Sequence, residues 1–301
     1  MTNDRMTDGR LPSFVIRHSS FRYCRRLTRR AHSSFPLAFR VLPRAKRDAM
    51  TALYAFCRAS DDLADEPGDP AAKRAALHGW RTRLRDALRR GIYTHRLHAA
   101  LHDAVHRYEV PSDYLEAVLD GVETDVVPVG FATFDELYPY CYRVASAVGV
   151  ACLYVWGTRD PDDLGPAIDL ATDAGIAFQL TNILRDLGED RARGRVYLPR
   201  DELERFGCPP ESWRPDNPAF RELMRFQVGR AREYYAKAAR GLPKADAGRL
   251  VAAEIMGAIY RRILDRIEDR DYDVFSSVVR IPRPRRALIA ASTWARTLVL
   301  P

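Results

Sequence analysis

Apolar residues recur at the spacing of an α-helix along nearly the whole chain, and few segments show the strict alternation of a β-strand. Prolines, glycines and polar caps separate these segments, as at Pro43 and Pro111. The pattern predicts helices over residues 21–31, 44–65, 71–90, 94–108, 112–124, 133–156, 166–190, 220–240 and 246–270. We therefore expect an all-α protein with a single domain over residues 18–301, preceded by a flexible tail over residues 1–17.

The helix predicted over residues 166–190 is mostly apolar but carries one polar stripe. Gln179, Asn182, Asp186 and Asp190 follow one another at intervals of three, four and four residues, so they share one helical face. Polar groups on a helix that otherwise looks buried are costly unless something pairs with them. Two carboxylates one turn apart, with amide oxygens behind them, suit an oxygen-seeking cation such as Mg²⁺.

An upstream helix ends on a similar acidic face. Arg58, Asp61 and Asp65 share one side after the apolar run 52–57. An Asp-x-x-x-Asp pair alone is more typical of a solvated helix face, but the two motifs together indicate a site for several Mg²⁺ ions and a diphosphate. Five arginines within or beside the motifs are available to hold phosphate oxygens: Arg58, Arg185, Arg191, Arg193 and Arg195.

A diphosphate neutralised in a dry, apolar cavity can leave as an anion and generate a carbocation. Aromatic faces stabilise such cations, although each aromatic residue taken alone is more typical of a protein core. The available aromatic residues are Phe35, Phe39, Tyr54, Tyr140, Tyr142, Phe178 and Tyr260.

The net charge of the 301-residue chain is +8, and much of it is concentrated in residues 17–47, which hold ten Arg or Lys and no Asp or Glu. Such a segment favours nucleic acid, anionic lipid or diphosphates, or is simply a solvated basic face. A non-catalytic, basic helical binding protein is thus a remote alternative to an enzyme. We expect no nucleic acid partner, because the interleaved aromatics of nucleic-acid modules are absent.

Five widely spread cysteines without a C-x-x-C pair indicate reduced thiols, as in a cytoplasmic protein, and neither a disulfide framework nor a zinc site. The seven histidines lie outside both motifs, and we expect them at the surface. We expect no signal peptide and no transmembrane helix. Residues 287–301, next to the basic stretch 280–286, are either a core-packed terminal helix or a peripheral contact with a membrane surface.

Both motifs, and the segments around them, resemble the squalene and phytoene synthases, which join two prenyl diphosphates head to head. The resemblance is carried by residues 54–65, 138–149, 180–190, 193–199 and the N-terminal stretch 32–43. The second motif is its most specific part, because terpene cyclases and head-to-tail prenyl synthases are expected to differ there. The resemblance implies an isoprenoid-synthase-type helical bundle with a central apolar cavity.

The resemblance also implies roles for individual residues. The implied metal ligands are Asp61, Asp65, Asn182, Asp186 and Asp190. The implied substrate-binding residues are Ser34, Phe35, Arg58, Gln179, Asn182 and Arg185. The implied catalytic residues are Tyr140, Tyr260 and Arg58.

The expected function is a Mg²⁺-dependent condensation of two prenyl diphosphates through a cyclopropylcarbinyl diphosphate. Our main expectation is squalene or a related C30 product from farnesyl diphosphate, with NADPH required only if the product is squalene. The alternative is a phytoene synthase of carotenoid biosynthesis that acts on geranylgeranyl diphosphate. The sequence does not indicate an oligomeric state.

Overall fold

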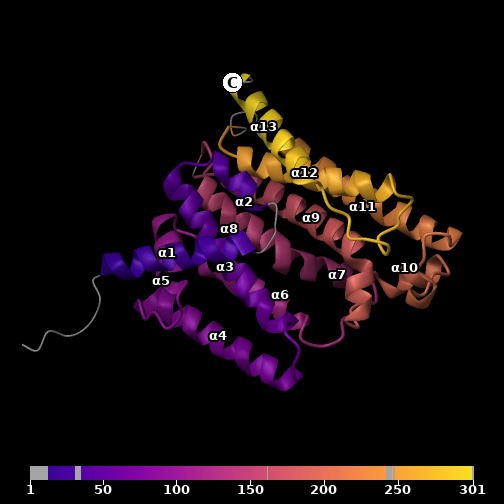
Figure 1. Cartoon of the computed structure of the whole chain (residues 1–301), viewed down its shortest axis with the longest axis horizontal. Coiled ribbons are helices and arrows are strands. Elements are labelled where there is room, and N and C mark those ends of the chain that lie inside the picture. The colour runs from indigo at the N-terminus through magenta and orange to yellow at the C-terminus, as the bar shows by residue number, and fades with distance from the viewer. Residues whose placement is uncertain (1–12, 31–34, 161, 242–245, 247, 300–301) are drawn as a thin grey trace, which may run out of the picture.

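The computed structural model describes residues 13–30, 35–160, 162–241, 246 and 248–299, and within them the regular structure is helical (Figure 1). Gly130 and Val196 form one isolated bridge. The elements are α1 (Ser13–Arg30), α2 (Phe35–Ala38), η1 (Phe39–Val41), α3 (Arg44–Asp65), α4 (Pro70–Arg90), α5 (His98–Arg107), α6 (Ser112–Thr124), α7 (Phe134–Cys141), η2 (Tyr142–Ser146), α8 (Ala147–Trp156), α9 (Gly165–Ala192), α10 (Arg200–Arg205), η3 (Pro210–Ser212), α11 (Pro218–Gly241), α12 (Val251–Glu268) and α13 (Arg283–Val299). The prediction of an all-α fold is confirmed.

Helix ends with a clear local signal lie where the sequence places them. The bounds of α3 and α6 match the prediction, and each helix follows a proline in an extended conformation. At the start of α4 the side chain of Asp69 accepts a hydrogen bond from the Ala72 amide at 2.9 Å. The same helix is capped at its C-terminus by Gly91, whose φ of 65° is left-handed.

Other helix ends differ from the prediction because tertiary contacts decide them. Helix α1 begins at Ser13, so it includes residues 13–17, which the sequence assigned to the tail. Its apolar face, with Phe21 and Cys24 buried, packs against α3 and α5. Helix α5 begins at His98 rather than at residue 94, since the His95 amide donates to the His98 ring Nδ1 at 3.2 Å. Helix α12 begins at Val251 rather than at residue 246, and the short α10 was not predicted.

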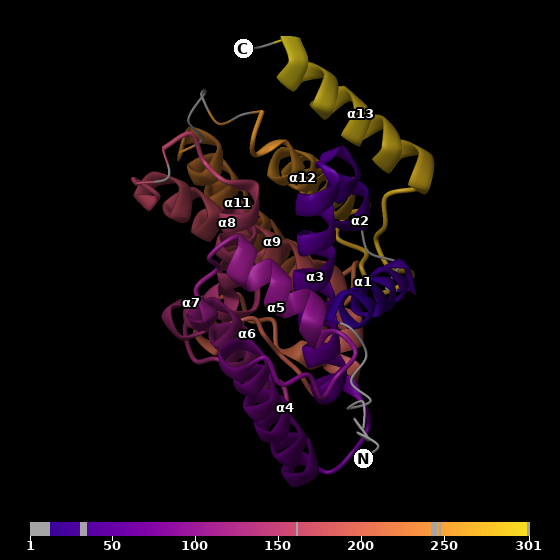
Figure 2. The same cartoon turned by 90° about the vertical axis from the view of Figure 1, so that its left-hand side faces the viewer.

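The helices form a layered bundle in which α4 lies along one edge and α13 along the opposite edge (Figures 1 and 2). Helices α3, α8 and α9 occupy the middle, where α8 contacts both α3 and α9. Helix α13 packs on α12. Across the described ranges, no helix combines the length and apolar character needed to cross a bilayer.

The single helix predicted over residues 133–156 is observed as α7, the π-helical turn η2 and α8 in direct succession. Pro139 lies inside α7 and cannot donate a backbone hydrogen bond, which favours a local change of helical pitch. The wider turn is held between two other helices at glycines. A Cβ atom at Gly175 of α9 would lie 2.4 Å from Ser146 Cα, and one at Gly121 of α6 would lie 2.6 Å from Val144 Cγ1.

The expectation that all histidines lie at the surface is wrong for His98, which is fully buried. Its ring lies 5.4 Å from that of Trp80 and 5.6 Å from that of His95. Burial, followed by the nearby His95 and Arg83, lowers the pKa of His98 to about 4, so this ring is neutral near pH 7.

Candidate active site

The two aspartate motifs lie in the last turns of the two central helices, α3 and α9. These helices have different principal neighbours: α3 packs mainly on α1 and α5, and α9 on α11. The two motifs nevertheless share one electrostatic environment, since the carboxylate of Asp125 acts on both Asp61 and Asp190. We call the region around Asp61, Asp65, Asp125, Asp186 and Asp190 the aspartate recess.

The first motif presents two carboxylates with different partners. Asp65 receives Arg195 Nη1 at 2.9 Å and has Arg193 Nη1 at 3.7 Å. Arg58 pairs with Asp62 at 2.5 Å instead of with Asp61. The Asp61 side chain is accessible to water although protein surrounds it closely, which is the arrangement of a group lining a recess. Desolvation and the negative charge of Asp65 raise the pKa of Asp61 to about 7.

The second motif contains an acceptor without a partner. Asn182 donates through Nδ2 to Gln179 Oε1 at 3.3 Å, while its own Oδ1 is buried and has no hydrogen-bond partner. Asp186 is held by Arg185, whose Nε donates to it at 2.8 Å. Desolvation and the charge of Asp186 raise the pKa of Asp190 to about 7. The stripe therefore contains a buried carbonyl oxygen that is free to accept a bond from a ligand, next to a carboxyl group whose pKa is raised mainly by desolvation.

Asp125 joins the recess to two tyrosines. Its carboxylate accepts from Tyr140 Oη at 2.9 Å and from Tyr197 Oη at 2.7 Å, and the two rings stack with centroids 5.1 Å apart. Arg195 Nη2 donates to the Asp125 backbone oxygen at 2.9 Å, while its Nη1 donates to Asp65. Burial raises the pKa of Tyr140, and the neighbouring Asp125 raises it further, so this phenol keeps its proton.

The segment that follows α9 is held against the rest of the chain by backbone hydrogen bonds and by Arg195. Gly194 has a φ of 75°, which turns the chain back toward the recess. Val196 N donates to Val129 O and Arg200 N to Phe131 O, each at 3.0 Å. The backbone pairing and the Arg195–Asp65 contact together hold this segment over the end of the two motifs.

Aromatic side chains from four elements meet beside the recess. Phe35 of α2 lies 5.6 Å from Tyr54 and 6.3 Å from Tyr260, measured between ring centroids. Tyr260 in turn stacks on Phe178 at 4.6 Å. Burial raises the pKa of Tyr260, while Arg185 and Asn182 beside its hydroxyl oppose the shift. The polar stripe of α9 thus borders an aromatic wall.

The structure separates some residues that the sequence grouped together. Arg191 donates to Pro210 O at 2.6 Å and lies over the rings of Trp213 and Phe275, so it is not a recess residue. Ser34 lies outside the described residues. The two predicted catalytic tyrosines lie in different surroundings. Tyr140 is hydrogen-bonded to Asp125, whereas Tyr260 packs against Phe35 and Phe178 in the aromatic wall.

Sequence reasoning did not single out Asp125 or its hydrogen-bond partner Tyr197. A single Asp after a helix and a single Tyr in a loop carry no spacing signal, and only the fold brings them together. Tyr197 does lie within the stretch 193–199 that carries the family resemblance, so that stretch was the one available signal.

The donor set of the recess fits Mg²⁺ by its chemistry. Its carboxylates and the unpartnered Asn182 oxygen are hard ligands, and burial together with neighbouring carboxylates raises the pKa of Asp61 and of Asp190. Over the described ranges no three His, Cys, Asp or Glu side chains converge on one point as a metal site. Mg²⁺ commonly takes only one or two protein carboxylates and completes its shell with water and substrate phosphates, so such an arrangement suits it.

An all-helical bundle with two aspartate motifs at the ends of central helices, beside an aromatic wall, defines the isoprenoid-synthase class of fold. Residues 28–286 match the family model described as squalene/phytoene synthase. The chain belongs to this family and is a prenyltransferase.

Curated relatives cover nearly the whole chain. A 15-cis-phytoene synthase of Synechococcus elongatus is 36% identical, covering 93% of this chain and 94% of the relative. A phytoene synthase of Arthrospira platensis is also 36% identical, with 95% and 93% covered. Among solved structures, a dehydrosqualene synthase with bound ligand has a TM-score of 0.83 at 26% identity, covering 96% of this chain and all of the other. A squalene synthase of Alicyclobacillus acidocaldarius has a TM-score of 0.74 at 29% identity, with 87% and 97% covered.

The relatives correct our ranking of the products. Head-to-head condensation of prenyl diphosphates is the chemistry of the family, as expected. The main expectation of squalene from farnesyl diphosphate is not specifically supported, and the relatives favour the phytoene alternative. Nothing supports NADPH as a cofactor.

Proposed function

We propose that this protein joins two molecules of geranylgeranyl diphosphate head to head and forms phytoene. The observation that carries this proposal is the aspartate recess beside an aromatic wall, in a chain whose relatives over nearly its full length are named phytoene synthases. In this scheme the C–O bond of one substrate breaks, and the diphosphate leaves with the electron pair. The double bond of the second substrate attacks the cation and a proton leaves, giving a cyclopropylcarbinyl diphosphate. A second ionisation, a rearrangement and a final proton loss complete the hydrocarbon.

The recess residues divide the work by their chemistry. Asp61 and Asp65 on α3, with Asn182, Asp186 and Asp190 on α9, would hold Mg²⁺. When bound, Mg²⁺ neutralises the leaving diphosphate.

The remaining recess residues act on phosphate and on the reacting carbons. Arg58 and Arg185 lie within the motifs and would take phosphate oxygens, with Gln179 positioned to hold Asn182 through its hydrogen bond. Phe35, Phe178 and Tyr260 present aromatic faces to a cation. Tyr140 would lie near the reacting carbons, held by Asp125 as a protonated phenol.

A product assay tests the proposal. Purified protein is incubated with Mg²⁺ and either geranylgeranyl or farnesyl diphosphate, with and without NADPH, and the extract is analysed by mass spectrometry. We expect a C40 hydrocarbon with a central conjugated triene from geranylgeranyl diphosphate, and its formation should need Mg²⁺ and not NADPH. A C30 hydrocarbon formed in preference to the C40 product, or no hydrocarbon from folded protein, would refute the substrate assignment.

We also propose that α13 makes a peripheral contact with lipid, where a C40 hydrocarbon would be delivered. Leu288 is 68% exposed and Trp294 46% exposed on this helix, and the exposed Arg283 and Arg285 lie at its start. Apolar side chains flanked by arginines suit the interface of an anionic membrane. The double variant Leu288→Ser/Trp294→Ser should lose sedimentation with phosphatidylglycerol vesicles while keeping its circular dichroism spectrum; unchanged sedimentation would rule this contact out.

A further inference from the structure

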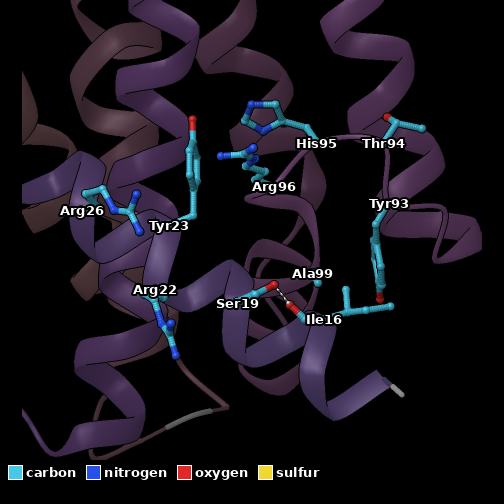
Figure 3. A pocket seen from close by; sticks show the side chains of 10 residues that line it. All are labelled: Ile16, Ser19, Arg22, Tyr23, Arg26, Tyr93, Thr94, His95, Arg96 and Ala99. Carbon is cyan, nitrogen blue, oxygen red and sulfur yellow. Dashed lines mark hydrogen bonds between the residues drawn. The ribbon is translucent and has the colours of Figure 1, made fainter. Parts of the chain in front are cut away.

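A second recess lies away from the aspartate motifs, between α1 and the irregular connection from α4 to α5 (Figure 3). It has a volume of about 480 Å³, within the range of small-molecule sites. Helix α1 supplies Ser19, Arg22, Tyr23 and Arg26, and the connection supplies residues 93–96. We call this recess the basic groove.

The positive charge of the basic groove is not compensated within the described residues. Its charged lining residues are Arg22, Arg26 and Arg96, and no Asp or Glu lines it. All three arginines are exposed. The nearby Asp103 is already engaged by Arg17 at 3.0 Å and Arg107 at 3.2 Å. Arginines from two separate elements therefore line one hollow, and its described lining contains no carboxylate.

Aromatic side chains also line the basic groove. Tyr23 meets His95 edge to face, with ring centroids 5.5 Å apart, and the hydroxyl end of Tyr93 points toward Ile16 (Figure 3). Burial lowers the pKa of His95, and the positive charges of Arg83 and Arg96 lower it further. Partial burial and two neighbouring arginines thus both disfavour a positive charge on this imidazole.

We propose that the basic groove is an accessory site for a phosphate-bearing anion, separate from the aspartate recess. A planar guanidinium group can donate two parallel hydrogen bonds to phosphate oxygens. Three arginines that line one hollow could therefore bind a single phosphate group together. The volume accommodates a diphosphate or a phosphate group with an organic remainder, which the tyrosine faces would contact. The ligand can be free diphosphate or the phosphate headgroup of a lipid, since both present the same oxygens. This proposal does not rest on the assignment of the substrate.

The test compares two arginine pairs of equal charge. Arg22→Gln/Arg26→Gln removes two groove arginines, and Arg74→Gln/Arg89→Gln removes two exposed arginines of α4 that do not line the groove. Binding of inorganic pyrophosphate is measured by titration calorimetry in EDTA, where the aspartate recess lacks the cation it needs for a diphosphate. Sedimentation with phosphatidylcholine vesicles, with and without phosphatidate, is measured in parallel.

We expect saturable binding to the wild-type protein that falls at least about tenfold in the groove variant and is unchanged in the α4 variant, as loss of charge-assisted hydrogen bonds implies. Loss of pyrophosphate binding assigns the groove to a soluble diphosphate. Loss confined to phosphatidate vesicles assigns it to a lipid headgroup. Equal binding by the two variants, or no saturable binding of either probe to the wild-type protein, would overturn the proposal.

Discussion

Asp125 connects both aspartate motifs to the tyrosines of the recess. Its carboxylate accepts from two phenols, and its backbone oxygen accepts from the same Arg195 that holds Asp65. Because its oxygen atoms accept hydrogen bonds from the two tyrosines and from Arg195, we regard it as a positioning residue. Its effect would pass through Arg195 to the ligands of the first motif.

We expect Asp125→Asn to weaken the use of Mg²⁺. An amide offers one acceptor oxygen where two phenols donate, so a buried hydroxyl loses its partner at a cost of about 1–3 kcal/mol. Loss of such an outer-sphere contact should raise the Mg²⁺ concentration for half-maximal turnover by roughly 10- to 100-fold. Turnover is measured against Mg²⁺ concentration, with the exposed Asp169→Asn of α9 as control. An unchanged Mg²⁺ dependence would show that Asp125 has no positioning role.

The raised pKa values of Asp61 and Asp190, both about 7, predict how metal-free protein responds to pH. The folded state favours the protonated carboxyls, so folding takes up protons between the ordinary carboxyl pKa and about 7. Stability in EDTA should therefore decline as pH rises from about 4 to about 7 and level off above. Mg²⁺ binding should strengthen over the same interval, because the ligands must be ionised.

Asp61→Asn should reduce the loss of folding stability that we expect in EDTA as the pH rises. The variant has no carboxylate charge to desolvate and none for Asp65 to repel, so in EDTA at pH 8 it should have a higher urea midpoint than the wild-type protein, and near pH 4 the difference should vanish. Asp169→Asn again serves as the control. A lower midpoint for Asp61→Asn at pH 8 would contradict the assignment of Asp61 to an uncompensated acidic recess.

At the scale of elements, the π-helical turn η2 packs closely against two glycines, Gly121 of α6 and Gly175 of α9. Gly175 allows the backbone of α9 to lie against Ser146, whose hydroxyl donates to Thr172 O at 2.7 Å. This contact lies one helical turn before Gln179. It therefore sets the position of the polar stripe along α9 relative to α7, the helix that carries Tyr140.

Gly175→Ala should destabilise the protein although alanine is the better helix former. The added Cβ would lie 2.4 Å from Ser146 Cα, a backbone atom that cannot simply turn away. Overpacking of this kind costs about 1–3 kcal/mol. Gly229→Ala in α11 is the matched control, because no atom lies within 4 Å of its Cβ position, and it should stabilise by up to about 1 kcal/mol. Urea midpoints that rise in both variants would disprove the role of this contact.

At the scale of the whole molecule, the bundle places two acidic helix ends at one recess without packing α3 broadly against α9. Helix α8 contacts both of them, Asp125 directly follows α6, and Arg195 in the segment after α9 pairs with Asp65. Ligands that bridge the two helix ends would therefore add contacts that the polypeptide lacks. The fold should be stabilised when the recess is filled.

Mg²⁺ together with pyrophosphate should raise the melting temperature of the wild-type protein, and more than either does alone. A ligand at 100 times its Kd adds about 2.7 kcal/mol to the free energy of unfolding. Asp61→Ala and Asp186→Ala should each lose this stabilisation and abolish turnover while keeping the helical circular dichroism spectrum. Full activity in either variant would show that the substituted aspartate is not a required Mg²⁺ ligand.

Local sequence determined most of the helices and both aspartate motifs. Periodicity, prolines and caps act within a few residues, which is why the bounds of α3 and α6 agree with the prediction. The stripe from Gln179 to Asp190 was readable because helical geometry alone brings its members to one face. The family, too, could be recognised from contiguous motifs.

Tertiary structure alone decided how these parts meet. Asp125 and Tyr197 lie 72 positions apart in sequence, and only the fold joins them in a hydrogen bond. The start of α1 and the burial of His98 depend on neighbouring helices, and the direction of Arg191 depends on Trp213 and Phe275. The basic groove likewise exists only where α1 packs beside the α4–α5 connection. Such contacts join distant segments, and no local pattern encodes them because their energy is gained only in the assembled bundle.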